Sequence, residues 1–208
     1  MKYMGSKRRI YKDILPIMLS ESYSWWVEPF VGGGNMIDKV SGSRLGSDIN
    51  PYVIQALIDI RDNVTDLPKN NLEFTEMDYK LLRVSDDYRY KGFAGFAYSY
   101  GGKWLCGWCR DGQNKRDYVR EAYNNALKQS PMLRGIDFVV SDYRELDIPR
   151  NSLIYCDPPY RETTKYAHDF DHDIFWNWCR EKRDKGHKIF VSEYTCPEDF
   201  ECVWEGKL

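Results

Sequence analysis

The sequence predicts an α/β fold, in which a parallel sheet is interrupted by a helical insertion. Short apolar runs of strand composition occur near both ends of the chain, namely "SWWVEPF", "SRLGSDIN", "IDFVVSD", "SLIYCD" and "HKIFVSEY". Stretches with helical spacing of apolar residues alternate with these runs, as is typical of a parallel sheet. From about residue 64 to residue 135, helix-like pieces are joined by glycines and no strong strand pattern occurs.

The individual helices follow from the spacing of apolar residues. In "KRRIYKDILPIML" these residues recur from Ile10 to Met18, and Pro16 predicts a kink or a break. "VGGGNMIDKV", after the first predicted strand, is typical of a glycine turn that opens a helix. The next helix is expected in "PYVIQALIDIRDN", because Pro51 suits a first helical turn. A further helix is predicted for residues 171–185.

The composition allows one large domain, or one domain with an insertion, in a chain of 208 residues. The chain is 42% hydrophobic and contains 16 tyrosines and 7 tryptophans, so it can bury a sizeable core. Such rings can also stack on bases. No apolar stretch approaches the roughly 18 residues that a membrane helix needs, and the start of the chain shows no signal-peptide pattern. We therefore expect a cytoplasmic protein without a membrane partner.

The cysteines and the charge balance give weaker indications. The six cysteines show no regular framework and are expected to be thiols. "CGWC", from Cys106 to Cys109, is the only C-x-x-C motif, and a zinc site would need a second pair, so we expect no metal. The net charge of −2 and the pI near 6.0 argue mildly against a nucleic-acid binder. "KYMGSKRR" and "RDGQNKRDYVR" are nevertheless locally basic, although each could be a solvated face.

A glycine-rich turn and an acid suggest a ligand that contains adenosine. "VEPFVGGGNM" fits F-x-G-x-G, and its glycines would let a ligand approach the backbone. It departs from the dinucleotide pattern G-x-G-x-x-G at Ile37, and it could simply be a tight structural turn. Asp48 ends the next strand, where an acid typically accepts hydrogen bonds from ribose hydroxyls. Asp48 could instead cap the following helix, although Asn50 competes for that position. Turn and acid together favour a dinucleotide or S-adenosylmethionine.

The segment "DPPY" forms what we call the shelf, residues 157–160. Proline fixes φ and restricts the residue before it, so the shelf should be stiff and extended just past a strand. Hydride transfer has no use for such a shelf, whereas methyl transfer to an exocyclic amino group does. Asp157 and the Pro158 carbonyl could each accept one N–H of the amine, and Tyr160 could stack on the base. Such a base must leave the helix stack. A proline-terminated strand end is the alternative.

These motifs resemble those of Dam-type DNA adenine N6-methyltransferases of bacteriophages and prophages. Lys2–Lys7 matches the family's K-[WY]-x-G-[GS]-K, Phe30–Gly34 its F-x-G-x-G, Asp48 its strand-end acid, and the shelf its D-P-P-Y. "VVSDYREL" is similar to the segment before the catalytic strand. The resemblance implies S-adenosylmethionine as cofactor, double-stranded DNA as partner, and a catalytic shelf of Asp157, Pro158, Pro159 and Tyr160. It also implies cofactor contacts by Tyr3, Lys7, Glu28, Phe30, Gly32, Gly34, Asp48, Asp142, Tyr143 and Asp157.

The order of the motifs resembles the α arrangement of that family, in which the insertion recognises the target sequence. The resemblance implies a catalytic domain of residues 1–51 and 136–208 and a helical target-recognition insertion of residues 52–135. Basic side chains among the aromatic residues of the insertion suit contacts with phosphates and base edges. The candidate DNA-binding residues are Lys103, Arg110, Lys115, Arg116 and, beyond the shelf, Tyr166. Tyr166 and Phe170 could close over the flipped base or pack as part of a lid.

Other activities of the same site stay open at this level. Cytosine N4 or RNA adenine could be the methyl acceptor, the protein could bind DNA without catalysis, and a dinucleotide oxidoreductase is a more distant alternative. The resemblance favours adenine because Asp, not Ser, heads the shelf. The chain stops at "FECVWEGKL", where members of the family commonly continue into a final hairpin strand. A monomer is expected.

Overall fold

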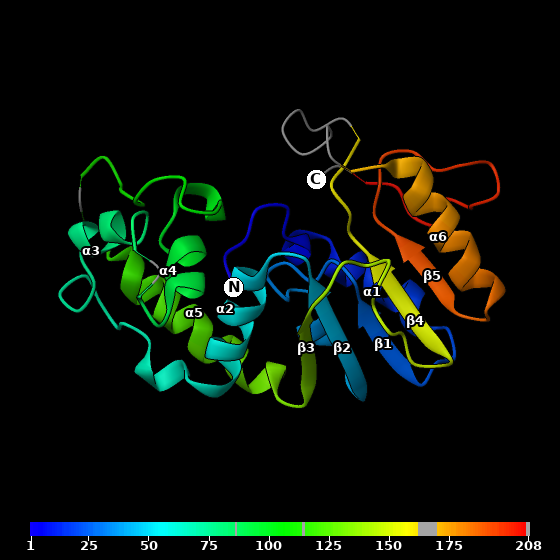
Figure 1. Cartoon of the computed structure of the whole chain (residues 1–208), viewed down its shortest axis with the longest axis horizontal. Coiled ribbons are helices and arrows are strands. Elements are labelled where there is room, and N and C mark those ends of the chain that lie inside the picture. Colours follow the sequence, from blue (N-terminus) through cyan, green and yellow to red (C-terminus); the bar gives the residue numbers. More distant parts are fainter. Residues whose placement is uncertain (86, 114, 162–169, 207–208) are drawn as a thin grey trace.

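The computed structural model of the chain describes residues 1–85, 87–113, 115–161 and 170–206, and its centre is a five-stranded parallel sheet (Figure 1). The strand order is β3-β2-β1-β4-β5. Val27 of β1 pairs with Leu45 of β2 on one side and with Ile154 of β4 on the other. The strands are β1 Trp25–Glu28, β2 Ser43–Asp48, β3 Ile136–Val140, β4 Ser152–Cys156 and β5 Lys188–Val191.

The order of the strands reverses between β1 and β4. From β1 the chain moves outward through β2 to β3, then returns to the other side of β1 to form β4 and β5. In open parallel sheets, ligands bind at such a switch point, beyond the carboxyl ends of the strands. Both the glycine turn, which follows β1, and the shelf, which follows β4, therefore leave the sheet at this place.

Helices lie beyond both edges of the sheet. In Figure 1, α3 to α5 extend beyond the β3 edge, whereas α6 lies beside β5 at the opposite end. The α-helices are α1 Tyr11–Leu19, α2 Pro51–Asp62, α3 Glu76–Leu81, α4 Lys91–Ala97, α5 Tyr118–Leu133 and α6 His172–Asp184. Short 3-10 turns are η1 Lys7–Arg9, η2 Ile37–Lys39, η3 Val64–Asp66 and η4 Tyr100–Gly102. The predicted α/β class and the helical character of the insertion are confirmed.

Local capping explains where two of these helices begin. The Asn50 side chain accepts the Tyr52 N–H over 3.0 Å, and Pro51 occupies the first turn of α2. The Asp171 side chain caps α6 by accepting the N–H of Asp173 and of Ile174, over 3.0 and 2.9 Å. Each cap satisfies N–H groups that have no partner within the helix. Asn50, rather than Asp48, is thus the cap of α2.

One local prediction is wrong, and one of the two outcomes considered at Pro16 is excluded. The glycine turn does not open an α-helix, since only the 3-10 turn η2 follows it and the chain turns again at Gly42, where φ is 89°. Too few residues separate these turns for a stable helix of several turns. Pro16 does not end α1, which continues to Leu19. Pro16 and Lys12, the residue four positions before it, are both exposed, so water can hydrate the carbonyl that loses its N–H partner.

The core lies on both faces of the sheet because neighbouring strand residues point in opposite directions. Trp26 belongs to the larger hydrophobic cluster, which joins the sheet to α1 and to the helices of the insertion. Val27 belongs to a second cluster on the α6 side. Leu153 and Ile154 of β4 divide between the clusters in the same way. Burial on both faces is typical of a parallel sheet and holds the central strands firmly under the candidate site.

We predict that Leu57→Ala lowers the free energy of unfolding by about 2–5 kcal/mol, as large-to-small changes in a core usually do. Leu57 of α2 is 0% exposed and its side chain lies against the glycine turn. Leu72→Ala is the matched control, because Leu72 is 93% exposed and should be nearly neutral. Urea denaturation of both variants measures the difference. Equal stabilities of the two would contradict this placement of Leu57.

Candidate functional site

The shelf leaves the sheet at its carboxyl edge. β4 ends at Cys156, and the Ser192 N–H donates to the Cys156 carbonyl over 2.9 Å, which continues the pairing with β5. Asp157, Pro159 and Tyr160 are partly exposed, whereas Pro158 is buried. The shelf thus lies with the end of β1 on one side and the end of β5 on the other.

Lys7 and Asp157 form an ion pair that joins the N-terminal segment to the shelf. The Lys7 ammonium lies 2.7 Å from each carboxylate oxygen, and it also donates to the Gly5 carbonyl over 3.1 Å. The Lys7 side chain is only 3% exposed and that of Asp157 is 23% exposed. Burial raises the pKa of Asp157, while Lys7 and the Tyr160 hydroxyl, which is hydrogen-bonded to this carboxyl, oppose the rise. The Lys7 ammonium also lies 5.0 Å from the centre of the Tyr160 ring.

Tyr3 covers the glycine turn. Gly32 and Gly34 have φ of 48° and 65°, a region that favours glycine. A Cβ atom on Gly32 would lie 2.8 Å from Cε1 of Tyr3, and one on Gly33 would lie 2.7 Å from Cβ of Tyr3. The turn therefore needs glycine both for its backbone conformation and for the close approach of Tyr3. Sequence reasoning attributed that space to a ligand, whereas part of it is taken up by the protein itself.

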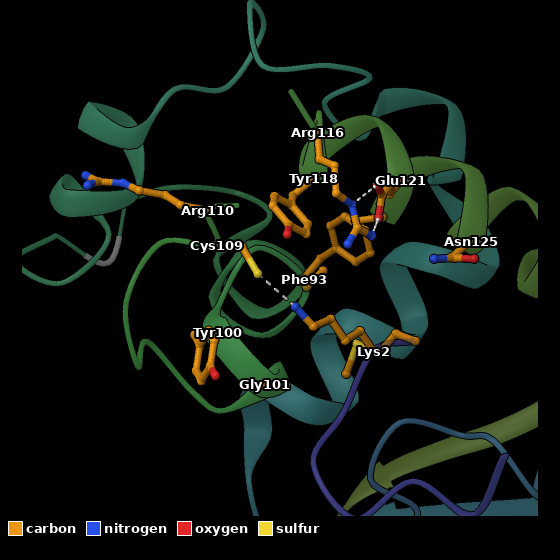
Figure 2. A pocket seen from close by; sticks show the side chains of 13 residues that line it. Lys2, Phe93, Tyr100, Gly101, Cys109, Arg110, Arg116, Tyr118, Glu121 and Asn125 are labelled. Carbon is orange, nitrogen blue, oxygen red and sulfur yellow. Dashed lines mark hydrogen bonds and ion pairs between the residues drawn. The ribbon is translucent and has the colours of Figure 1, made fainter. Parts of the chain in front are cut away.

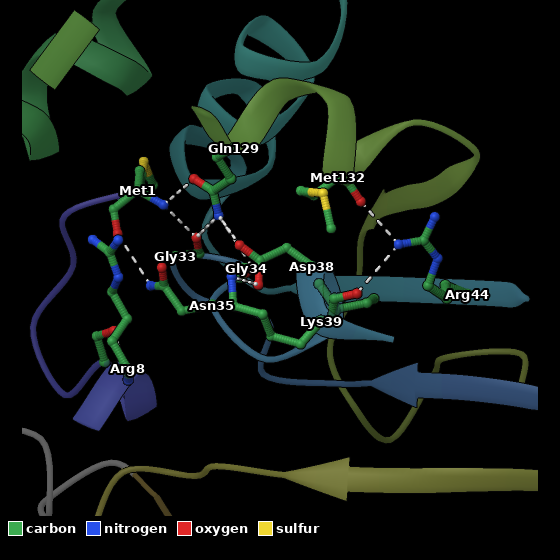
Figure 3. A network of polar contacts seen from close by, with 12 residues as sticks. Met1, Arg8, Gly33, Gly34, Asn35, Asp38, Lys39, Arg44, Gln129 and Met132 are labelled. Carbon is green, nitrogen blue, oxygen red and sulfur yellow. Dashed lines mark hydrogen bonds and ion pairs between the residues drawn. The ribbon is translucent and has the colours of Figure 1, made fainter. Parts of the chain in front are cut away.

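A buried polar network holds the turn from the side of the insertion (Figure 3). Gln129 of α5 donates to the carbonyls of Gly33 and Gly34 over 3.1 and 3.2 Å, and to Asp38 over 3.0 Å. The main-chain nitrogen of Met1 donates to the Gly33 carbonyl over 2.7 Å. Sequence reasoning missed Gln129, because a single glutamine about 95 positions away carries no local signal.

Asp48 braces the same turn from β2. One carboxylate oxygen accepts the Gly32 N–H over 3.2 Å and the other accepts the Asn50 N–H over 2.9 Å. Burial raises the pKa of Asp48 to about 6. Each carboxylate oxygen has two acceptor positions, so Asp48 can still accept hydrogen bonds from a ligand hydroxyl. The open acceptor positions of Asp48 suit hydroxyl donors such as those of a ribose.

The other predicted cofactor contacts lie at the same edge of the sheet. Glu28, at the end of β1, is buried and accepts the indole N–H of Trp26 over 2.8 Å. Burial raises the pKa of Glu28 well above its usual value, and the nearby Asp38 and Asp157 add to the rise. The rings of Phe30 and Tyr143 lie 5.2 Å apart between their centres. Asp142, just past β3, forms an ion pair of 2.6 Å with Arg144.

Two of the candidate DNA contacts, both arginines, line a cavity of about 350 Å³ on the insertion (Figure 2). Arg110 and Arg116 line this cavity, but each is engaged by an acid: Arg110 pairs with Glu76, and Arg116 pairs with Glu121 over 2.6 Å. The N-terminal segment reaches the same cavity through Lys2, which donates to Cys109 Sγ over 3.0 Å.

The remaining candidates are separate from this cavity. Lys103 and Lys115 are exposed on the insertion and are not among the lining residues. Tyr166 lies outside the described residues. Phe170 packs with its ring centre 5.9 Å from that of Phe30, as the lid-packing interpretation expects. Tyr160 lies with its ring edge-on to Tyr194 at 5.0 Å.

Two classes of site are not found in the described part of the chain. No helix there combines the length and the apolarity of a membrane span. No group of three or more His, Cys, Asp or Glu side chains there could hold a metal ion. Cys106 is exposed and Cys109 is buried, and both are free thiols.

Comparisons with known proteins find similarity to DNA methyltransferases. Residues 3–91 match the family model described as D12 class N6 adenine-specific DNA methyltransferase. This stretch contains the N-terminal motif from Tyr3 onward, the glycine turn and Asp48, and it ends before the shelf. The five-stranded parallel sheet and this match are consistent with a Rossmann-like methyltransferase fold.

One curated relative extends the similarity beyond that stretch. The chain is 23% identical over 205 residues to the type II methyltransferase M.FokI of Planomicrobium okeanokoites. The similarity covers 86% of this chain and 31% of M.FokI, so the chain spans about a third of the length of this relative.

We predict that Lys7→Met destabilises the protein by about 3 kcal/mol or less at neutral pH, because it leaves the carboxylate of Asp157 without its partner. In this variant the pKa of Asp157 in the folded state should rise further above the unfolded value of about 3.9. The loss of stability should therefore be present at pH values above the unfolded pKa and shrink as the pH falls toward about 4.

Denaturation at several pH values measures this effect. Asp157→Asn in the Lys7→Met background should restore most of the stability, since no charge is then buried. Lys12→Met, at an exposed position of α1, is the matched control. A loss that is the same at pH 4.5 and pH 7.5 would contradict the charge argument.

Proposed function

We propose that this chain transfers a methyl group from S-adenosylmethionine to N6 of an adenine in double-stranded DNA. The observation that carries the proposal is the ion pair of Lys7 with Asp157, which fixes a D-P-P-Y shelf at the switch point of the sheet, next to the glycine turn. The match of residues 3–91 to an adenine-specific methyltransferase family and the similarity to M.FokI support it.

The cofactor would lie at the carboxyl edge of β1 and β2, where it supplies an electrophilic methyl group on a sulfonium. Asp48 would accept hydrogen bonds from the ribose, beside Gly32 and Gly34. Phe30 and Tyr143 would supply an apolar surface for the adenine ring, near Asp142. Glu28 would supply an acidic side chain to the cofactor site, and Tyr3 and Lys7 would border it from the N-terminal side.

The shelf would prepare the target amine for attack. Asp157 and the Pro158 carbonyl would each accept one N–H, so the nitrogen lone pair points outward. Lys7 contacts both oxygens of Asp157 and the Tyr160 hydroxyl is bonded to the same carboxyl, so of its roughly four acceptor positions one stays open for the amine. The nitrogen forms a bond to the methyl carbon as the carbon–sulfur bond breaks, and the electron pair of that bond stays on sulfur. The proton that the nitrogen then loses passes to Asp157 or to water.

Tyr160 would stack on the target base, and Pro159 would keep the shelf extended. The Tyr160 hydroxyl interacts with Asp157, and its ring makes a T-shaped contact with the ring of Tyr194. These two contacts restrain the orientation of the Tyr160 ring before a base arrives. A prearranged ring costs less entropy when the base stacks on it.

The insertion, residues 52–135, would recognise the DNA, as in the α arrangement of Dam-type enzymes of phages. Arg110 and Arg116 would exchange their acidic partners for phosphate or base edges. Lys103 and Lys115 would contact phosphates, and Tyr166 is proposed to lie against the flipped base. We further propose that the protein acts as a monomer.

The decisive test is transfer of labelled methyl from S-adenosylmethionine to plasmid DNA, followed by mass analysis of the nucleosides. We expect N6-methyladenine, and we expect Asp157→Asn to lower the rate by at least about 10²-fold, as loss of one prearranged group commonly does. Asp184→Asn, at an exposed position of α6, should keep the wild-type rate. N4-methylcytosine would refute the choice of adenine, and DNA binding without any transfer would favour a non-catalytic protein.

A second prediction concerns the pH dependence of cofactor binding. Burial raises the pKa of Asp48 to about 6, so the ionised carboxylate predominates only above that pH. A charge-assisted hydrogen bond is about 1 kcal/mol stronger than a neutral one, which corresponds to about fivefold in affinity. Calorimetric titration should therefore show binding that tightens by about this factor as the pH rises through 6. Asp48→Asn should flatten the profile, and an unchanged profile in this variant would contradict the role of Asp48.

A further inference from the structure

Glu193 is a buried acid beside the shelf whose role no motif explains. It lies two residues beyond the end of β5, and its side chain is 5% exposed. One carboxylate oxygen accepts the main-chain N–H of Tyr194 over 2.8 Å. The main-chain N–H of Arg161 also interacts with this carboxylate and tends to lower its pKa. The other oxygen, Oε2, has no hydrogen-bond partner among the described residues and faces Nδ1 of His172 at 3.8 Å.

These contacts connect Glu193 to the shelf at two points. Arg161 directly follows Tyr160, so the Arg161 N–H fixes the chain where it leaves the shelf. Tyr194 lies edge-on to Tyr160, with 5.0 Å between ring centres, and its N–H is held by the same carboxylate. The pairing of Cys156 with Val191 and the Ser192 N–H bond to Cys156 bring the end of β5 alongside the shelf. One side chain thus restrains both the backbone after Tyr160 and the ring against it.

Stability alone does not account for an acid at this position. Burial raises the pKa of Glu193 and the nearby Asp157 carboxylate adds to the rise, while the Tyr194 N–H, His172 and the Arg161 N–H oppose it. A buried carboxylate oxygen without a partner has a cost that an apolar or amide side chain would avoid. The two N–H groups that Glu193 accepts belong to residues that flank or contact Tyr160, which points to positioning as its role.

We propose that Glu193 is a positioning residue, which holds Tyr160 in the orientation for stacking on the target base by fixing Arg161 and Tyr194. The proposal rests on the proposed methyl transfer. Glu193 does not touch the reacting atoms. Its effect should appear in the chemical step on DNA and not in the binding of the cofactor, which would lie on the β1 and β2 side of the sheet.

The test compares Glu193→Ala, Glu193→Gln and the control Glu198→Ala, an exposed acid of the same loop. At saturating S-adenosylmethionine, Glu193→Ala should lower kcat on DNA by about 10–100-fold, since small displacements of a positioning group cost up to about 10²-fold. The Kd for S-adenosylmethionine should stay within about twofold of the wild type. Glu193→Gln should keep kcat within about threefold, because the amide oxygen still accepts both N–H groups.

Hydrogen exchange of the Arg161 amide adds a readout that does not depend on activity. Protection of this amide should fall in Glu193→Ala and persist in Glu193→Gln. A wild-type kcat in Glu193→Ala, or a Glu193→Gln variant as slow as Glu193→Ala, would overturn the positioning role. If the wild-type protein transfers no methyl group, the proposed function fails, while the exchange experiment still tests the bond to Arg161 by itself.

Discussion

The ion pair between Lys7 and Asp157 is the contact on which the geometry of the site depends. It connects residues 150 positions apart, and it puts a nearly fully buried ammonium against a carboxylate that burial alone would tend to protonate. Neither charge would be stable here without the other. Because Asp157 begins a shelf stiffened by two prolines, fixing this carboxylate also fixes the orientation of the residues that follow it.

The short N-terminal segment links three parts of the chain that the sequence keeps apart. Tyr3 lies against the glycine turn after β1, Lys7 holds the shelf after β4, and Lys2 donates to the Ser99 carbonyl in the insertion. Gln129 completes the connection from α5 to the turn. A displacement of the insertion would therefore reach both sides of the site through this short segment. The site and the insertion form one connected structure for this reason.

Sequence reasoning succeeded where the signal is local. The strands, the Pro51 start of α2 and the position of the shelf follow from runs of a few residues, and the structure confirms them. The helix expected after the glycine turn is replaced by the 3-10 turn η2. The glycine pattern does not show how soon the chain turns again, and that spacing leaves too few residues for an α-helix. Gln129 and Glu193 could not be found in this way, since each acts through main-chain groups that only the fold brings near.

The acids around the shelf suggest why a cationic cofactor would suit this edge of the sheet. Burial raises the pKa of Glu28 and of Asp157, and the charge of Asp157 adds to the rise for Glu28. Lys7 contacts Asp157 directly, so one basic side chain is paired with these acids and the acids outnumber it. A sulfonium placed among these acids would favour their ionised forms, whereas the neutral thioether left after methyl transfer would not. On the proposed function, the same electrostatics would hold the reactive cofactor more firmly than its product, because only the former carries the positive charge.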